Sequence, residues 1–243
     1  MYTRKEFEQQ RAVWARGMFR DRRLQRQALD LLVRADRRNW IHQTSWFGQP
    51  VLQLPQDLFA LQEIIHRTRP SVIVEAGVAW GGSLLFYATL MESLGGRIVG
   101  IDVYIPPDLR RRLMSYGRLS RRITLIKGSS IDPAAVARVK GLVGRNRKVM
   151  VVLDSYHTHQ HVLAELRAYA PLVGRGQYLV CCDTVVDRMP VQAHRARSWG
   201  PGNNPMTALR AFLAESPQFE PDRALEDKLL LTCNPGGYLR RKR

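Results

Sequence analysis

A carboxylate and several histidines stand close together in the middle of the chain. Asp154 directly follows the apolar run 149–153, and His157, His159 and His161 come soon after it. An imidazole has a pKa of about 6.5, so it can take a proton from a hydroxyl near neutral pH. If His159 begins a helix, His157 projects toward a cleft, and we expect His157 to be a general base and His159 a second catalytic candidate. The alternative is that the histidines cap or pack that helix and only Asp154 has a function.

A second carboxylate follows the next apolar run along the chain. Asp183 comes after the run 178–182, which ends in Cys182. The carboxyl ends of neighbouring parallel strands meet at one edge of a sheet, so Asp154 and Asp183 should emerge side by side. Two such carboxylates can hold a hard divalent cation. The sequence therefore predicts a candidate metal site at this edge.

The segment 72–83, V-I-V-E-A-G-V-A-W-G-G-S, is a candidate cofactor loop. Its small residues let the backbone approach a ligand, and the start of a helix offers free amides. Dinucleotide-binding loops carry G-x-G-x-x-G, whereas here the glycines are spaced differently and an acidic residue closes the strand. A carboxylate suits S-adenosylmethionine, which has an ammonium and a sulfonium but no pyrophosphate. An ordinary turn of another α/β fold is the alternative. We predict that the cofactor contacts Glu75, Gly77, Gly81, Gly82 and Ser83.

Further cofactor contacts are expected at the ends of other strands. Asp102 closes the run 97–102, where a carboxylate can accept hydrogen bonds from both ribose hydroxyls of an adenosine. Ser129 and Ser130 follow the run 123–127 and could contact adenine, although such residues also make ordinary turns. Asp154 completes the predicted cofactor contacts.

Short β-branched runs alternate with helical segments from residue 71 onward, which predicts a Rossmann-like α/β fold with a mostly parallel sheet. An antiparallel closing hairpin is expected near the end, from strands at 219–221 and 229–233 with a turn at 234–237. The predicted parallel strands are 72–75, 97–102, 123–127, 149–153 and 178–182, and the predicted helices are 82–94, 107–116, 132–143, 159–169 and 205–214.

The beginning of the chain has a different pattern. Residues 4–38 show apolar side chains at helical spacing among charges, which predicts one or two polar helices. Residues 40–55 look like a loop, and Asp57 is placed to cap a helix that runs to about residue 67. We expect residues 1–55 to form a helical extension, or cap, on a catalytic domain at 56–243.

The composition bounds the class of protein. The 243 residues include 38 basic and 21 acidic side chains, a formal net charge of +17, which would attract nucleic acid or phosphorylated molecules but also fits solvated arginines on a surface. The three cysteines are too few for a disulfide framework, and we find no signal peptide or membrane span. We therefore expect a cytoplasmic enzyme.

Several spaced motifs resemble the cephalosporin hydroxylase and rhamnosyl O-methyltransferase family, whose members have the class I methyltransferase fold. The resemblance runs from about Trp46 to Arg240. The matching segments are 55–58 (P-Q-D-L), 75–77 (E-A-G), 81–83 (G-G-S), 128–130 (G-S-S), 153–159 (L-D-S-Y-H-T-H), 165–166 (E-L), 169–173 (Y-A-P-L-V), 183–184 (D-T), 202–205 (G-N-N-P) and 234–239 (N-P-G-G-Y-L).

This resemblance implies a magnesium-assisted methyl transfer with metal ligands at Asp154, Cys182 and Asp183. Members of the family usually carry Glu where this chain has Cys182, and a thiol is a poor ligand for Mg²⁺. Three outcomes are open: a weaker magnesium site completed by water, which we favour; a softer metal held by Cys182 and a histidine; or metal-free catalysis that relies on His157.

We therefore predict an S-adenosylmethionine-dependent O-methyltransferase. The resemblance implies an acceptor hydroxyl on a sugar or glycosylated natural product, and it suggests self-association into a homo-oligomer. One alternative is an RNA-directed methyltransferase, suggested by the basic charge, which would bind polynucleotides tightly and in a salt-sensitive way. Another is a noncatalytic cofactor-binding accessory protein that lost turnover through Cys182. Oxygenation ranks low because no iron triad or flavin motif is present.

Overall fold

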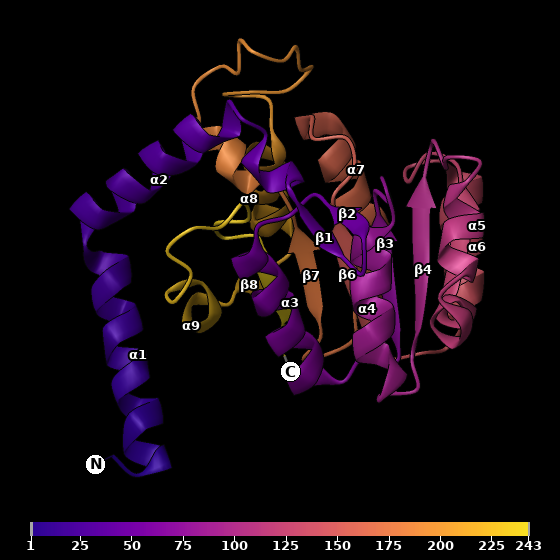
Figure 1. The fold of residues 1–243 in the computed structure, drawn as a ribbon, viewed down its shortest axis with the longest axis horizontal. Helices are drawn as coiled ribbons and strands as arrows, with labels where there is room; N and C mark the ends of the chain where they lie inside the picture. Colours follow the sequence, from indigo (N-terminus) through magenta and orange to yellow (C-terminus); the bar gives the residue numbers. More distant parts are fainter. Residues whose placement is uncertain (1, 243) are drawn as a thin grey trace.

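The computed structural model describes residues 2–242. Its main feature is a seven-stranded sheet in the order β5-β4-β3-β6-β7-β9-β8, with helices on both faces (Figure 1). Strands β3 to β7 pair in parallel, whereas β9 is antiparallel to both β7 and β8. The predicted Rossmann-like α/β class is therefore confirmed. The strands are β3 (Val72–Ala76), β4 (Arg97–Asp102), β5 (Ile123–Lys127), β6 (Val149–Leu153), β7 (Tyr178–Cys181), β8 (Phe219–Pro221) and β9 (Tyr238–Arg241).

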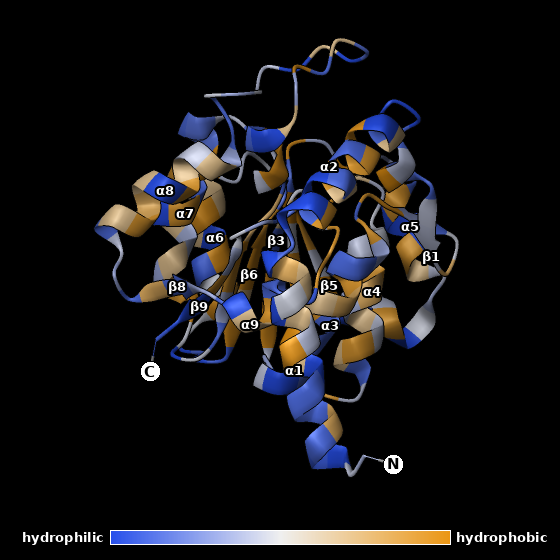
Figure 2. Cartoon of the chain, turned by 90° about the vertical axis from the view of Figure 1, so that its left-hand side faces the viewer, coloured by the Kyte–Doolittle hydropathy of each residue, from blue (hydrophilic) through white to orange (hydrophobic). Residues whose placement is uncertain are grey.

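Each face of the sheet packs against its own set of helices, as Figure 2 shows. The helices α6 (Pro133–Val143), α7 (His159–Tyr169) and α8 (Pro205–Glu215) share one apolar cluster with alternate strand residues such as Val151. The opposite cluster contains α3 (Pro55–Thr68), α4 (Gly82–Glu92) and α5 (Leu109–Met114) with the intervening strand residues such as Val152. Because both faces are covered, β3 and β6 are buried along their whole length, which explains their continuous apolar runs. Short 3₁₀ turns lie at Gly117–Arg122 (η2), Ala170–Leu172 (η3) and Thr184–Arg188 (η4).

The predicted closing hairpin exists, but the prediction of one of its two strands is wrong. Residues 229–233 form no strand, and the strand that pairs with β8 is β9. A buried carboxylate explains the difference: Asp57 accepts hydrogen bonds from the Thr232 hydroxyl, the Cys233 amide and the Tyr238 hydroxyl. The Cys233 amide is a backbone group that a strand would have paired, and the segment runs as an irregular chain after the short helix α9 (Arg223–Glu226).

The start of α3 also differs from the prediction, in which Asp57 caps the helix. The cap position is Leu54, which makes no side-chain hydrogen bond, and Asp57 lies inside the first turn of the helix. The stretch before α3 is not a plain loop either. After the turn η1 (Trp40–His42), β1 (Thr44–Trp46) and β2 (Gln49–Val51) form a small antiparallel hairpin. Phe47 and Gly48 both have positive φ, the backbone that a tight two-residue hairpin requires.

The predicted N-terminal helices are α1 (Arg4–Arg20) and α2 (Arg22–Asp36). Thr3 and Glu6 form a capping box at the start of α1, and the Asp21 side chain caps α2. Helix α1 buries none of its residues and extends away from the rest of the molecule (Figure 1), whereas α2 buries Ala28, Leu32 and Asp36. Within residues 2–242, none of the helices combines the length and the apolar character needed to cross a lipid bilayer.

Candidate active site

A cavity of about 380 Å³ opens at the carboxyl ends of the central parallel strands. Its floor includes Gly77, Asp102, Asp154 and Asp183, which follow or end β3, β4, β6 and β7. Ligands bind at this edge in open α/β sheets because the loops there are free to vary while the strands hold them in place. The structure therefore places the predicted loop and the predicted acid and histidine cluster in the wall of one cavity.

The glycines of the loop are required by close packing. Gly77 has φ of 93°, and a Cβ there would lie 1.8 Å from the backbone oxygen of Asp154. A Cβ on Gly82 would lie 2.2 Å from the backbone oxygen of Pro50, so this glycine lets the β1–β2 hairpin approach α4. Gly81, with φ of 80°, precedes α4 and lies outside the cavity lining, whereas Ser83 belongs to it. Both backbone approaches would be blocked by any side chain.

Glu75 lies beneath this loop and not in the cavity wall. It is fully buried, and the Ser83 hydroxyl donates to its carboxylate at 2.8 Å. Burial raises the pKa of Glu75 to about 8, since a charged carboxylate loses its hydration there. The Glu75 carboxyl is therefore mostly protonated at neutral pH. A cation placed above the loop would favour its ionised form.

Asp102 faces the cavity and also fixes the loop. Its Oδ2 accepts hydrogen bonds from the amides of Val78 at 2.7 Å and Ala79 at 3.1 Å, and Oδ1 accepts one from the Tyr104 amide. Ala79 is held at φ of 45°, a backbone conformation that costs energy for a residue with a side chain. The two amide bonds offset that cost, and they tie the shape of the loop to the end of β4.

Ser130 belongs to a buried polar network behind the cavity wall. The hydroxyls of Ser130 and Ser155 both donate to the carboxylate of Glu165, which is fully buried on α7. The His161 Nε2 atom lies 3.4 Å from the same carboxylate. Ser130, Ser155 and His161 line the cavity, whereas Ser129 does not. Sequence reasoning recorded Glu165 only as part of the family resemblance, since a single Glu on a helix gives no sign of burial.

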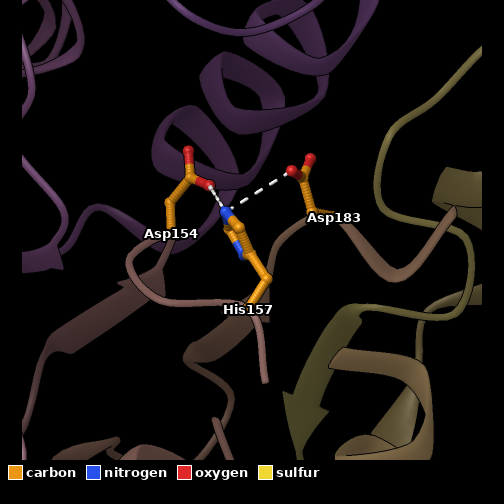
Figure 3. Close-up of side chains that lie close together, drawn as sticks. All are labelled: Asp154, His157 and Asp183. Atoms are coloured by element: carbon orange, nitrogen blue, oxygen red, sulfur yellow. Dashed lines mark ion pairs between the residues drawn. The ribbon is translucent and has the colours of Figure 1, made fainter. Parts of the chain in front are cut away.

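Asp154, His157 and Asp183 form a cluster whose candidate ligand atoms all lie within 4.8 Å of one another (Figure 3). The imidazole of His157 points between the two carboxylates. Its Nε2 atom is 3.5 Å from Asp183 Oδ2 and 3.9 Å from Asp154 Oδ1. Asp183 has φ of 54°, a strained conformation for aspartate that directs its side chain from the end of β7 into the cluster. The structure thus brings the two predicted carboxylates together and adds His157 to them.

The pKa of Asp154 is raised to about 6, first by burial and then by the negative charge of Asp183. His157 and the Gln53 side chain act in the opposite direction. Gln53, which sequence reasoning missed, donates to Asp154 Oδ2 at 3.2 Å from the chain between β2 and α3. Two carboxylates that repel each other in a partly buried site are a natural place for a cation.

Cys182 lies apart from this cluster. Successive residues of a strand point to opposite faces of the sheet, so Cys181 and Cys182 enter the two different apolar clusters. Cys182 is 2% exposed, and burial raises the pKa of its thiol well above the ordinary value. Among the described residues, the group of candidate metal ligands contains His157 where the resemblance implied Cys182.

His159 also lies outside the cavity lining. It begins α7, where its amide donates to the Asn203 side chain and its Nδ1 atom lies 2.9 Å from the Thr207 hydroxyl of α8. These contacts join two helices, which matches the structural alternative considered for the histidines. His157 and His161 face the cavity.

Sequence reasoning missed the wall opposite the cofactor loop. Trp199 packs edge to face with the rings of Tyr156 at 5.3 Å and His157 at 5.1 Å, and the Arg197 guanidinium lies 4.9 Å from its ring centroid. Side chains of the N-terminal residues complete the wall, so these residues border the cavity as well as covering the fold. They are Leu32, Asp36, Ile41, His42, Pro50 and Leu52.

Comparison with known proteins decides the family. The model of the Rhamnosyl O-methyltransferase/CmcI family matches residues 38–242. The chain belongs to this family. As a member it is an S-adenosylmethionine-dependent O-methyltransferase, which confirms the predicted class of enzyme and its cofactor. The matched range begins slightly earlier than the resemblance recognised from motifs.

Curated relatives and solved structures agree with this assignment. The rhamnosyl O-methyltransferase of Mycobacterium tuberculosis is 30% identical over 200 residues, which cover 81% of this chain and 77% of the relative. The enzyme of the same name from Mycobacterium leprae is 31% identical over 201 residues, 82% of this chain and 83% of the relative. An apo structure of CmcI has a TM-score of 0.58 at 20% identity and covers 83% of this chain and 77% of its own. A CmcI structure described as Mg-SAM has a TM-score of 0.56 at 20% identity, with 83% and 78% covered. At these identities the solved structures show the shared fold.

Proposed function

We propose that the chain transfers the methyl group of S-adenosylmethionine to a hydroxyl of a sugar or glycosylated natural product, with a divalent metal at the site. The relatives that carry a curated name are rhamnosyl O-methyltransferases. The observation that carries the proposal is that the loop around Gly77 and the cluster around His157 face the same cavity. A methyl donor on one side and a hydroxyl on the other would then meet within it.

The cofactor side is formed by the ends of β3, β4 and β5. Asp102 is available to the ribose hydroxyls, and the cavity face of Ser130 is available to the adenine. The methionine part then lies over Gly77, Gly82 and Ser83, close to Asp154. Glu75 acts from below: the positive charge of the cofactor would favour its ionised form, and the Ser83 hydroxyl would hold it in place.

His157 is the proposed base. Its Nε2 takes the proton of the acceptor hydroxyl as the oxygen forms a bond to the methyl carbon, and the bond from that carbon to sulfur breaks to leave S-adenosylhomocysteine. The carboxylates of Asp154 and Asp183 lie 3.9 Å and 3.5 Å from Nε2 and hold the ring between them. The edge contact with Trp199 fixes the plane of the ring.

The donor set fits a divalent metal ion. Asp154 and Asp183 supply two clustered carboxylates, and the negative charge of Asp183 contributes to the raised pKa of Asp154. Mg²⁺ prefers oxygen, so these carboxylates would hold it and leave the imidazole free as the base. When bound, the ion lowers the pKa of an acceptor hydroxyl that contacts it. Cys182 is buried in an apolar cluster and is not among the clustered candidate ligands, which favours the weakened oxygen site over a thiolate site.

The same cluster argues against the accessory-protein alternative. That alternative rests on the loss of a ligand at Cys182, yet Asp154, His157 and Asp183 still converge without it. The RNA alternative rests on charge alone, and a cavity of about 380 Å³ suits a small acceptor better than a polymer.

We also propose that a second copy of the chain covers α1. This helix has 17 residues, and an isolated helix of that length is only marginally stable in water. It exposes Phe7, Val13, Trp14 and Phe19, and it carries no buried residue. Phe7 and Trp14 share one face of the helix, with ring centroids 6.3 Å apart, and an exposed apolar pair on a projecting helix is typical of an interface.

A methyl-transfer assay tests the proposed reaction. The protein would be incubated with S-adenosylmethionine labelled in its methyl group, Mg²⁺ and a panel of glycosides that includes rhamnosides, with polynucleotide RNA as a separate arm. Label in a glycoside as an alkali-stable ether supports the proposal. Label in RNA alone, or cofactor binding without transfer to any acceptor, would favour one of the alternatives.

A further inference from the structure

The wall opposite the cofactor loop carries cations that the proposed methyl transfer does not use. These cations are Arg195 and Arg197, and the neighbouring His42 also lines the cavity. They come from two segments, η1 and the irregular chain between η4 and α8. Arg195 is partly buried in the cavity wall, whereas Arg197 is exposed at its rim, and both line the cavity, which separates them from the other basic residues of this strongly charged chain.

These cations have few anionic partners. Arg195 binds Asp36 through its Nη2 atom, while its Nε and Nη1 atoms are buried without a hydrogen-bond partner. Asp36 has other partners as well, because its carboxylate also accepts a hydrogen bond from the Gln192 side chain and lies 3.2 Å from the His194 ring. Among the described residues, Arg197 forms no ion pair with a carboxylate, and its contact is the ring of Trp199. Unpaired charge-assisted donors in a partly buried wall are costly unless a ligand satisfies them.

This excess positive charge contributes to lowered pKa values in the cavity wall. The pKa of His42 is lowered, first by burial and then by the charges of Arg195 and Arg197. The pKa of Arg197 is lowered by burial and by Arg195. Asp36 and Asp183 oppose both shifts without cancelling them. An anion between the two guanidinium groups would relieve this repulsion.

The position of Arg197 points to the acceptor and away from the cofactor. Trp199 lies between Arg197 and His157, in contact with both. One molecule can therefore place a hydroxyl at His157 and extend past the indole to Arg197.

We propose that the acceptor carries an anionic group, a phosphate or a carboxylate, which Arg197 and Arg195 bind while its hydroxyl lies at His157. This inference rests on the proposed function and narrows its substrate class. A guanidinium presents paired N–H donors that match two oxygens of either group. The indole of Trp199 then packs against the body of the acceptor between its two ends.

Anion binding in the presence of the cofactor product tests this proposal. Inorganic phosphate, and acetate in a second series, would be titrated by calorimetry into protein saturated with S-adenosylhomocysteine at constant ionic strength. The variants are Arg197→Gln and, as a matched control, Arg138→Gln, which removes the same charge from the exposed face of α6. We expect saturable binding that weakens about ten-fold or more in Arg197→Gln and is unchanged in Arg138→Gln, because a charge-assisted bond is lost only in the first. The anion that binds more tightly identifies the group.

Three results would overturn the anion site: no saturable binding of either anion, equal weakening in both variants, or displacement of S-adenosylhomocysteine by the anion. The last would mean that the arginines bind the carboxylate of the cofactor. A protein that fails to bind S-adenosylhomocysteine would instead count against the proposed function. In that case, a phosphate titration without S-adenosylhomocysteine would still test whether the two arginines bind an anion.

Discussion

His157 directs its Nε2 atom at Asp183, 3.5 Å from Oδ2, although the two residues lie on loops that follow different strands. The contact depends on the positive φ of Asp183, which turns its side chain toward β6. The two carboxylates hold the imidazole of His157 in the wall of the cavity, where it can meet an acceptor hydroxyl.

Replacing the base should slow turnover and leave cofactor binding intact. We expect His157→Gln to lower kcat by about 10²- to 10⁴-fold, the usual contribution of general base catalysis. The affinity for S-adenosylhomocysteine should stay within error of the parent, because His157 is assigned to the acceptor side. Single-turnover rates and calorimetry measure the two effects. His66→Gln, an exposed histidine on α3, is the control. Equal rates for the two variants would remove His157 from the mechanism.

The identity of the metal should affect the base. Mg²⁺ prefers the carboxylates of Asp154 and Asp183, whereas Zn²⁺ also takes imidazole and would capture His157. We therefore expect Mg²⁺ to support methyl transfer, chelation to reduce it, and Zn²⁺ added in excess to inhibit it. Initial rates in metal-depleted buffer with each ion measure this. If Zn²⁺ supports the same rate as Mg²⁺, His157 is not the base; a rate that survives chelation would mean that the carboxylates hold no required ion.

Glu75 should make the cofactor-free protein less stable as the pH rises. Its pKa in the folded protein is about 8, above its ordinary value of 4.5. A raised pKa adds stability that is fully present below about pH 4.5 and is lost as pH rises through about 8, because the folded state then holds a buried charge. We expect Glu75→Gln, which keeps the shape without the charge, to flatten this decline between those two values. Thermal unfolding of both proteins across this range measures it. The same slope in Glu75→Gln would assign the effect to other groups.

Helix α1 should control assembly. Replacing Trp14 by Glu puts a charge on the exposed apolar face that we assign to a second copy. We expect the variant to shift the mass measured by light scattering from an oligomer toward the monomer. Arg16→Glu, on the same helix, changes the charge without removing apolar surface and serves as control. A parent protein that is already monomeric at micromolar concentration would contradict the assignment.

The sequence was sufficient to predict the parallel part of the sheet, because strands such as β3 and β6 are continuous apolar runs bounded by turn residues and polar loop ends. The convergence of Asp154 and Asp183 followed from strand order alone. The part that could not be predicted depends on contacts between distant residues. Nothing local shows that Asp57 organises residues 232–238, or that Arg197 and Trp199 reach the cavity from an irregular segment.

Two further differences come from side-chain direction. Alternation along β7 places Cys182 in the apolar cluster on one face, which a motif alignment cannot convey. His159 follows His157 closely, yet the first turn of α7 directs it to Thr207 on α8. Spacing therefore marked the right segment, and the backbone conformation decided which of its residues face the cavity.

The central claim is that the cavity binds S-adenosylmethionine with Asp102 on the ribose. Calorimetry with S-adenosylmethionine and S-adenosylhomocysteine, with and without Mg²⁺, tests it in the parent, in Asp102→Ala and in Asp30→Ala, which removes an exposed carboxylate of α2. The account predicts saturable binding to the parent and to Asp30→Ala, and a loss of about ten-fold or more in Asp102→Ala, since charge-assisted hydrogen bonds to the ribose are removed. Binding that is unaffected by Asp102→Ala would contradict the placement of the ribose, and no binding to the parent under any condition would contradict the central claim.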